Sequence, residues 1–231
     1  MKLKLVKKIL EAQGTKSFIF QPEKPISFVP GQYIYCTLPK LNYPDAKGAT
    51  RHFTVASSPT EEGLMITTKI STESGYKKTL DELPIGSFVE TQEPNGTFIF
   101  DEKESGAHIF LAGGIGITPF RSMIKYIADN NLVTPIYLIY SNSDADIPFK
   151  KEFNDISKAH SNIKIQYLIS STQGHLDQGK IESFMGSWGA EIEKSTWWVC
   201  GPPPFIDAME DVLRKLSVPG RQIRSEKFTG Y

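Results

Sequence analysis

The segment 108–131, HIFLAGGIGITPFRSMIKYIADNN, limits the folds open to this chain more than any other stretch. Its first residues, 108–112, form a short apolar run bounded by glycine, which is typical of a strand buried on both faces of a parallel sheet. Gly113, Gly114 and Gly116 follow, and glycine permits a positive φ or a close approach of the backbone to a ligand. The sequence therefore predicts a buried strand that ends in a tight glycine turn.

A helix is predicted directly after this turn. Thr118 suits the N-cap position, and Pro119 suits the first helical position, where a missing backbone N–H costs nothing. Apolar residues then recur at helical spacing, at Phe120, Met123, Ile124 and Ile127. A strand, a glycine turn and a helix N-terminus direct unpaired N–H groups and the positive end of a helix dipole to one point. Such a point suits a phosphate or a pyrophosphate.

The glycine spacing leaves a second interpretation open. The motif reads GGxGxTP, which differs from the dinucleotide-binding fingerprint GxGxxG. A glycine turn between a strand and a helix also forms where the two elements only pack closely together. Nucleotide binding and close packing are both compatible with this turn.

Strands and helices alternate through the rest of the second half. Apolar runs at 134–141, 163–169 and 196–200 predict strands. Helical patterns cover 149–159, 180–186 and 203–216. The alternation predicts parallel βαβ units with right-handed crossovers. Ligands of such sheets lie at the carboxyl ends of the strands, where Gly114, Ser141 and Cys200 are expected.

The first hundred residues follow another pattern. Short alternating segments at 3–10, 17–20, 32–38, 51–56, 64–70 and 88–91 are separated by turn residues. This spacing predicts an antiparallel barrel or sandwich. One helix is expected at 76–83, and the loop 39–50 is either without function or covers a ligand.

The segment 51–58, RHFTVASS, carries residue types suited to a ligand that has a phosphate and a planar ring. Arg51 and Phe53 share one face of a strand, while His52 and Thr54 point the other way unless the strand twists or ends there. A fixed guanidinium suits a phosphate, and an aromatic face suits a planar ring. A purely structural role for this Arg and Phe pair also remains open.

Composition excludes several other functions. The 26 basic and 26 acidic residues cancel, so no overall field favours nucleic acid or an anionic membrane. The two cysteines, Cys36 and Cys200, lack the spacing of an iron–sulfur or zinc site or of a disulfide scaffold. The N-terminus MKLKLVKKIL reads as a strand rather than a signal peptide, and no segment has the length of a membrane span. We therefore expect a soluble cytoplasmic protein without a metal site.

Taken together, the motifs resemble those of the ferredoxin–NADP reductase superfamily along essentially the whole chain. FVPGQY, RHFTVASS, the segment 75–83, EPNGTF, LAGGIGITP, CGPPPF and the closing EKF occur in that family's order. The resemblance implies an N-terminal flavin-binding β-barrel domain at 1–104. It further implies a C-terminal NAD(P)-binding α/β domain with a doubly wound parallel sheet at 105–231.

The resemblance also implies roles for residues of the first domain. Arg51 would hold the flavin phosphates, Phe53 would pack on the isoalloxazine ring beside His52, and Thr54 would hydrogen-bond near flavin N5. The family usually has Tyr where this chain has Phe53, so one phenol hydrogen bond is lost. The segment that binds the pyrophosphate through its amides corresponds to Gly75, Tyr76 and Lys77.

For the second domain, the resemblance places nicotinamide over the glycine turn and the ends of the neighbouring strands. Cys200 would lie beside the nicotinamide, Glu226 would help to organise the site, and Ser141 would lie near the adenosine ribose. In some relatives a terminal aromatic residue covers the flavin, and whether Phe228, the terminal Tyr231 or neither does so here is left open. The implied nucleotide-binding set is Gly113, Gly114, Gly116, Thr118, Ser141, Cys200, Gly201, Pro202 and Phe228.

The function implied by the resemblance is hydride transfer from NADH or NADPH to bound FAD, with Thr54, Cys200 and Glu226 as catalytic residues. The electrons would pass to a separate carrier, namely a ferredoxin, a flavodoxin or an oxygenase component. Two alternatives stay open: a flavin reductase that uses free flavin as its substrate, and a redox subunit that binds flavin without oxidising NAD(P)H. Asp144 slightly favours NADH, because it would repel a 2′-phosphate, although Lys150 and Lys151 lie nearby.

Overall fold

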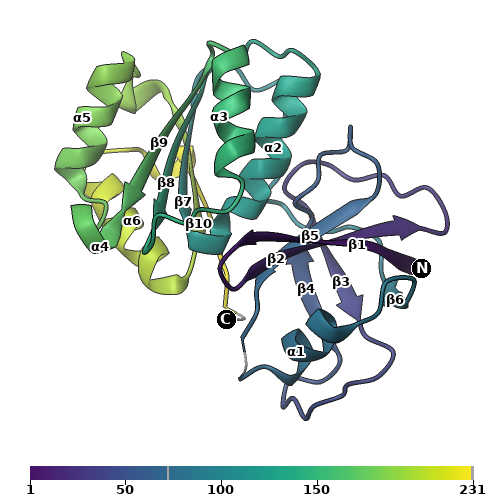
Figure 1. Cartoon of the computed structure of the whole chain (residues 1–231). Helices are drawn as coiled ribbons and strands as arrows, with labels where there is room; N and C mark the ends of the chain where they lie inside the picture. The colour runs from purple at the N-terminus through teal and green to yellow at the C-terminus, as the bar shows by residue number, and fades with distance from the viewer. Residues whose placement is uncertain (72, 230–231) are drawn as a thin grey trace. The chain divides into compact units, whose positions relative to one another are not determined.

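The structure is a computed structural model that describes residues 1–71 and 73–229 (Figure 1). The chain divides into two compact units. Unit 1 comprises Met1–Phe100 and Arg121–Tyr126, and unit 2 comprises Asp101–Phe120 and Ile127–Tyr231. The prediction that Tyr231 covers the flavin falls on a residue outside the described ones.

Unit 1 is an antiparallel β structure, as the alternating segments predict. Its strands are hydrogen-bonded in the order β4–β3–β6–β1–β2–β5. The two outer strands approach each other where the Ala56 N–H, just after β4, donates to the Met65 carbonyl of β5 at 2.7 Å. The elements are β1 (Lys2–Ala12), β2 (Thr15–Pro22), β3 (Tyr33–Thr37), β4 (Thr50–Thr54), β5 (Leu64–Lys69), α1 (Gly75–Glu82) and β6 (Phe88–Thr91).

The core of unit 1 follows from the period of two in its strands. Alternate residues of a strand face opposite sides, so Leu3 and Leu5 of β1 are fully buried, as are Phe18 and Phe20 of β2. Each such side chain contributes about 1.5–3 kcal/mol when it leaves water. The side chains of Tyr76 and Leu80 bring helix α1 into the same core.

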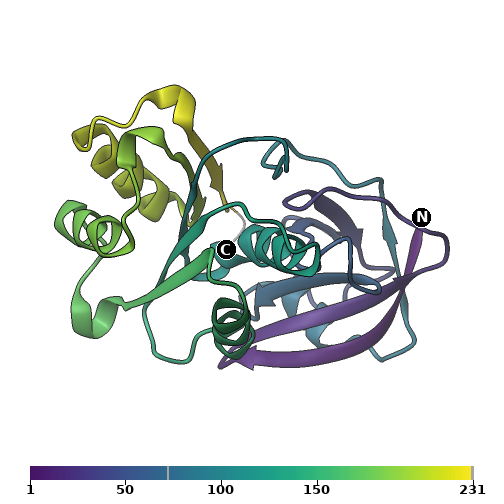
Figure 2. The ribbon, with the colours of Figure 1, turned by 90° about the horizontal axis from the view of Figure 1, so that it is seen from above.

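Unit 2 is a parallel sheet with helices on both faces, as predicted (Figures 1 and 2). Its strand order is β11–β10–β7–β8–β9. The strands are β7 (His108–Gly113), β8 (Ile136–Asn142), β9 (Ile163–Ile169), β10 (Thr196–Gly201) and β11 (Ile223–Lys227). The helices are α2 (Ile117–Asp129), α3 (Lys150–Ala159), α4 (Ser170–Gln173), α5 (Gln178–Trp188) and α6 (Pro203–Lys215), with 3-10 turns at Gly114–Gly116, Ile192–Lys194 and Gly220–Gln222.

The two faces of this sheet are covered by different helices. Leu111 and Val199 pack with Ile181 of α5 and Met209 of α6 on one face. On the other face the ring of Phe110 stacks on Phe120 of α2, with 4.6 Å between centroids. The ring of Tyr140 meets Phe153 of α3 edge-on. Because both faces are covered, the central strands are apolar throughout, which is why their sequence shows runs rather than alternation.

Three local features differ from the sequence-based expectation. Helical structure begins with the 3-10 turn at Gly114, so Thr118 lies inside the first turns and is not an N-cap; its hydroxyl donates to the Ile115 carbonyl at 3.2 Å. Helix α5 is longer than the predicted 180–186, because Asp177 caps its start and Gly189 ends it. The closing segment forms an additional parallel edge strand, β11, beside β10.

The described residues contain neither a membrane-spanning helix nor a metal-binding cluster of the usual kind. Within 1–71 and 73–229, no helix is both long and apolar enough to cross a bilayer. The same residues hold no group of three or more His, Cys, Asp and Glu side chains placed to share a metal ion. Cys36 and Cys200 are both buried as free thiols.

Candidate functional site

In unit 1, the predicted phosphate-binding Arg51 is held in a fixed position by the loop before it. Its Nη1 donates to the carbonyls of Lys47, Gly48 and Thr50 at 2.8, 3.0 and 2.7 Å. Its Nη2 forms an ion pair with Asp45. Only 12% of the Arg51 side chain is exposed, so the guanidinium is largely shielded from water.

Helix α1 begins beside this ion pair. Ser74 is the N-cap, and its hydroxyl accepts from the Lys77 N–H at 3.3 Å. The same hydroxyl donates to Asp45 Oδ2 at 2.9 Å, and the Tyr76 N–H donates to that oxygen at 2.9 Å. A guanidinium, a hydroxyl and a helix N-terminal amide thus converge on one point. This donor set fits the oxygen atoms of a phosphate.

Gly75 is required here by a close approach of the chain to itself. A Cβ at this position would lie 2.2 Å from the Pro44 carbonyl oxygen and 2.7 Å from that of Tyr43. Any larger residue would therefore push the loop away from the start of α1. The glycine brings Asp45 onto the helix N-terminus.

The remaining predicted flavin contacts of β4 point in two directions. Phe53 is only 6% exposed and belongs to the barrel core, where its ring lies 5.9 Å from that of Tyr76. His52 is exposed on the opposite side, with its ring 5.6 Å from Tyr33. Thr54 is buried at the end of the strand. The stacking role of Phe53 and the role of Thr54 near N5 stay predictions.

Lys77 lies in the first turn of α1 and is 5% exposed. Burial, followed by repulsion from Arg51 and Lys47, lowers the pKa of its ammonium group to about 8. A nearby anion would reverse part of this shift, because it stabilises the charged form. Lys77 is therefore a further cation suited to a phosphate ligand.

In unit 2, the glycines of the turn fall into two groups: those that close packing requires and one that it does not. A Cβ at Gly116 would lie 2.2 Å from the Cys200 carbonyl oxygen, and one at Gly113 would lie 2.7 Å from the Phe205 ring. Gly201 is restricted by Phe205 and Gly113 in the same way. Gly114 differs: its φ is +53°, and a Cβ there would meet no atom within 4 Å. Gly114 thus presents open backbone at the turn.

The strand register brings the other predicted nucleotide contacts to the same sheet edge. Gly113 of β7 pairs with Ser141 of β8, and Ala112 pairs with Cys200 of β10. Cys200 pairs in turn with Glu226 of β11. These residues lie at or near the carboxyl ends of parallel strands, where open α/β sheets bind ligands.

Cys200 and Glu226 form an unusual pair of acids at this edge. Burial, followed by the charge of Glu226, raises the pKa of the Cys200 thiol well above its ordinary value. The thiol is therefore protonated and acts as a packing group rather than a nucleophile. Burial raises the pKa of Glu226 to about 7. Its Oε2 is buried without a hydrogen-bond partner in the described part of the chain.

The residues after β10 and β11 complete the edge. Pro202 is exposed and caps helix α6, and the Phe228 N–H donates to the Gly201 carbonyl at 2.9 Å. The Phe228 side chain is 9% exposed. The structure thus brings Gly201, Pro202 and Phe228 close in space.

The sequence interpretation missed Asp45 as a member of the flavin-phosphate region. Its carboxylate accepts from Ser74, Tyr76, Arg51 and the Lys47 N–H. The Tyr76 N–H contributes most to lowering the pKa of Asp45 to about 2, so this carboxyl is ionised at neutral pH. The one available signal was that Asp45 is the only acidic residue of the loop 39–50.

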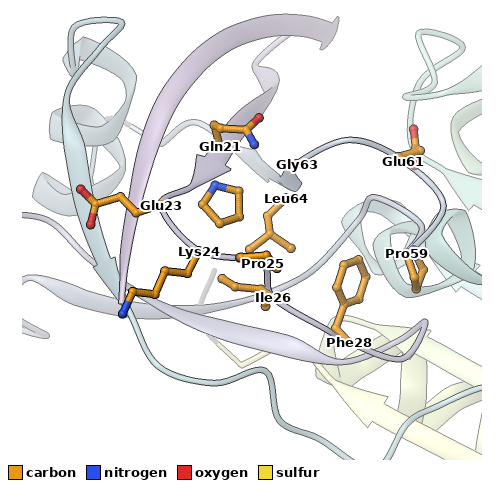
Figure 3. Close-up of a pocket in the computed structure, with 11 residues that line it drawn as sticks. Gln21, Glu23, Lys24, Pro25, Ile26, Phe28, Pro59, Glu61, Gly63 and Leu64 are labelled. Atoms are coloured by element: carbon orange, nitrogen blue, oxygen red, sulfur yellow. The ribbon is translucent and has the colours of Figure 1, made fainter.

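Two hollows lie apart from these residues. In unit 1, a hollow of about 360 Å³ has Glu23 and Lys24 at one end and Phe28 and Pro59 at the other (Figure 3). In unit 2, an open groove of about 500 Å³ follows β8 and is lined by Lys150, Lys151 and Lys158 with Asp146, Asn154 and Asp155. None of the predicted site residues lines either hollow.

Comparison with known proteins identifies both units. Residues 2–100 match the family model of the oxidoreductase FAD-binding domain, and residues 110–211 match that of the oxidoreductase NAD-binding domain. Flavohemoprotein A of Dictyostelium discoideum is 27% identical over 237 residues, which cover 96% of this chain and 58% of that protein. The glycine betaine monooxygenase reductase subunit of Chromohalobacter salexigens is 24% identical over 241 residues, which cover 98% of this chain and 63% of that protein. The chain thus spans less than two thirds of either relative.

A solved structure agrees in fold. The ferredoxin–NADP⁺ reductase from Plasmodium falciparum superposes with a TM-score of 0.82 at 20% identity, covering 98% of this chain and 95% of that one. Its fold, the two matched domain models and the site geometry lead to one assignment. The chain belongs to the oxidoreductases that carry an FAD-binding and an NAD-binding domain, and it has the fold of a ferredoxin–NADP⁺ reductase.

Proposed function

We propose that this chain is a reductase that uses NAD(P)H to reduce bound FAD and delivers the electrons to a separate redox protein or oxygenase component. The observation that carries the proposal is the carboxyl edge of the parallel sheet. There, the open backbone of Gly114 directly follows β7, the strand that pairs with Cys200 of β10, and Cys200 pairs in turn with the half-buried Glu226 of β11. A flat nicotinamide ring needs such an uncrowded edge in order to stack on the flavin ring.

The chain's own residues would bind and orient the two nucleotides. Arg51, the Ser74 hydroxyl and the Tyr76 N–H would hold a flavin phosphate, with Lys77 as a further cation. Gly114 would admit the nicotinamide nucleotide, and Glu226 would hold a proton at its carboxyl below about pH 7. Bound flavin supplies the redox chemistry, because it accepts a hydride and releases single electrons. The protein's contribution is mainly alignment.

The proposed acceptor is a separate protein. One relative is named as the reductase subunit of a monooxygenase, and other relatives are flavohemoproteins. Neither Cys36 nor Cys200 has iron–sulfur spacing, and both are buried. The name of the monooxygenase reductase subunit supports a one-electron carrier or an oxygenase component as the proposed partner.

NADH is the proposed co-substrate. Lys151 pairs with Asp155 at 3.1 Å, and the Lys150 ammonium lies 5.4 Å from the centre of the Tyr167 ring. Both lysines would have to leave these contacts to reach a 2′-phosphate. Asp144, which accepts from Ser143 at 2.9 Å, adds a negative charge to the loop after β8. These contacts support NADH over NADPH.

A flavin reductase that uses free flavin as its substrate is the second candidate. The observation in its favour is Asp45, whose carboxylate already satisfies the donors that would hold a flavin phosphate. Because Asp45 occupies these donors, such a site would have a lower affinity for FAD and would release it more readily.

One assay separates the two candidates. Flavin-loaded protein, freed of excess flavin, is mixed with NADH or NADPH and ferricyanide as a one-electron acceptor. The proposal predicts ferricyanide reduction without added flavin. It also predicts a kcat/KM for NADH at least about tenfold above that for NADPH, equal to about 1.4 kcal/mol. Activity only when free flavin is supplied would favour the second candidate, and a preference for NADPH would refute the proposed co-substrate.

A further inference from the structure

The anion site at the start of helix α1 already contains an anion from the chain itself. Asp45 Oδ2 accepts from the Tyr76 N–H and the Ser74 hydroxyl, both at 2.9 Å. Its Oδ1 pairs with the Arg51 guanidinium and accepts from the Lys47 N–H at 2.9 Å. The two carboxylate oxygens thus use the donors that a phosphate would need.

The position of this carboxylate is strongly fixed. Only 8% of the Asp45 side chain is exposed, so water does not compete effectively for it. The missing side chain of Gly75 lets the Pro44 carbonyl lie directly against the start of the helix. At the other end of α1, the Tyr43 hydroxyl donates to Glu82 at 2.7 Å. The loop is therefore fastened along the helix at Asp45 and at the residues just before it.

A carboxylate and a phosphate oxygen cannot occupy this point together. Two anions sharing one guanidinium and one helix N-terminus would repel each other in a site that is poorly hydrated. Phosphate binding would have to release Asp45 from Arg51 and Tyr76. The loop that carries Asp45 would then move away from the start of α1.

We infer that the Asp45 carboxylate competes with a flavin phosphate for this subsite. Because a phosphate must first displace the carboxylate, the chain binds phosphate-bearing flavins more weakly than it would without Asp45. The inference rests on the proposed function, because it takes Arg51 and the start of α1 as the subsite for the flavin phosphate. It adds a specificity-determining residue that discriminates between flavins by their phosphates. Riboflavin, which has no phosphate, is unaffected by this competition.

The test compares flavin binding by wild-type protein and the variant Asp45→Asn. Asparagine keeps the size of the side chain and one acceptor for the Tyr76 N–H, but it removes the charge. The dissociation constants of FAD and riboflavin are measured on flavin-free protein by quenching of flavin fluorescence. The Kd of FAD is expected to fall by about tenfold, the scale of one charge-assisted contact, while the Kd of riboflavin stays the same.

Glu82→Gln provides a matched control. It also removes one negative charge, at the far end of α1, and loosens the same loop at Tyr43, but the hydrogen bonds of Glu82 are to Asn42 and Tyr43 and not to Arg51. Its ratio of riboflavin to FAD Kd is expected to stay within about twofold of wild type. An equal rise of this ratio in both variants would overturn the inference, as would an unchanged or weaker FAD affinity in Asp45→Asn.

A second probe separates this inference from the proposed function. Inorganic pyrophosphate, titrated calorimetrically into flavin-free protein, reports on the anion site without a flavin ring. Tighter pyrophosphate binding by Asp45→Asn, with no binding of any flavin, would support the competition and contradict the proposed function. Flavin binding with equal pyrophosphate affinity in both proteins would contradict the competition and leave the proposed function standing.

Discussion

Glu226 is a residue whose ionisation affects the stability of unit 2. Burial raises its pKa from 4.5 to about 7, so the folded state favours the protonated carboxyl. The stability that this preference provides is complete below about pH 4.5 and is lost as the pH rises through about 7. Above that pH, folding leaves a charge in a poorly hydrated position beside Cys200.

The variant Glu226→Gln should remove this dependence on pH. Below pH 5 its Tm should match that of wild type, and at pH 8 it should lie a few degrees higher, because 1 kcal/mol moves Tm by about 2–4 °C in a chain of this size. Thermal unfolding between pH 4.5 and pH 8 measures the difference. Glu210→Gln changes an exposed carboxyl that accepts from Ser225 of the same strand and serves as the control. A constant offset between Glu226→Gln and wild type at every pH would contradict the assignment.

At the scale of elements, two glycines of the turn from β7 to α2 have different predicted roles. Gly116 is required for close packing, and Gly114 leaves space for a nucleotide. In Gly116→Ala the new Cβ would lie 2.2 Å from the Cys200 carbonyl oxygen. This oxygen belongs to the backbone of a central strand, so it cannot move away without disturbing the sheet. The expected loss of stability is about 3 kcal/mol. In Gly114→Ala nothing lies within 4 Å, and the positive φ costs about 1–2 kcal/mol.

The two variants should therefore fail in different ways. Gly116→Ala should show the larger fall in Tm. Gly114→Ala should stay folded but bind NADH more weakly, because its Cβ projects into the open edge. Thermal unfolding and the Kd for NADH are measured on both proteins. Unchanged NADH affinity in Gly114→Ala would contradict the predicted binding role of Gly114. An equal loss of Tm in both variants would contradict the predicted difference in packing.

Most elements were predictable because their patterns are local. The run 108–112 and the helical spacing from Phe120 to Ile127 identify β7 and α2 from neighbouring residues alone. Strand β11 was not predicted, because IRSEK is polar and becomes a strand only by pairing with β10. Thr118 was misplaced as an N-cap because the preceding glycines already form a helical turn.

The candidate site was less predictable, for the same physical reason. Residue types such as Arg51 and Gly114 can be recognised along the chain, but their partners cannot. Asp45 meets the Tyr76 N–H across 31 positions, and Gly116 meets Cys200 across more than eighty. Such contacts depend on the folded backbone. Sequence patterns therefore predicted the hydrogen-bond donors of the site, such as Arg51, but not Asp45, the anion that these donors bind.

At the scale of the whole molecule, the chain combines a barrel and a parallel sheet, each with its own core. The residues Arg121–Tyr126 belong to unit 1 although they follow the glycine turn in sequence. Within unit 1, the buried Arg121 pairs with Glu61 at 2.8 Å and donates to the Ala56 carbonyl at 2.8 Å. The domain boundary between 104 and 105 that the resemblance implies stays a prediction.

The central claim is that one chain binds FAD and lets NADH reduce it. The most direct test is the visible absorption spectrum of the protein loaded with FAD and freed of excess flavin, recorded under argon during titration with NADH. The account predicts near-stoichiometric FAD whose visible absorption band is bleached by about one equivalent of NADH, since a hydride transfer reduces the flavin by two electrons. A protein that retains no FAD, or one whose bound FAD is not bleached by NADH or NADPH, would contradict it.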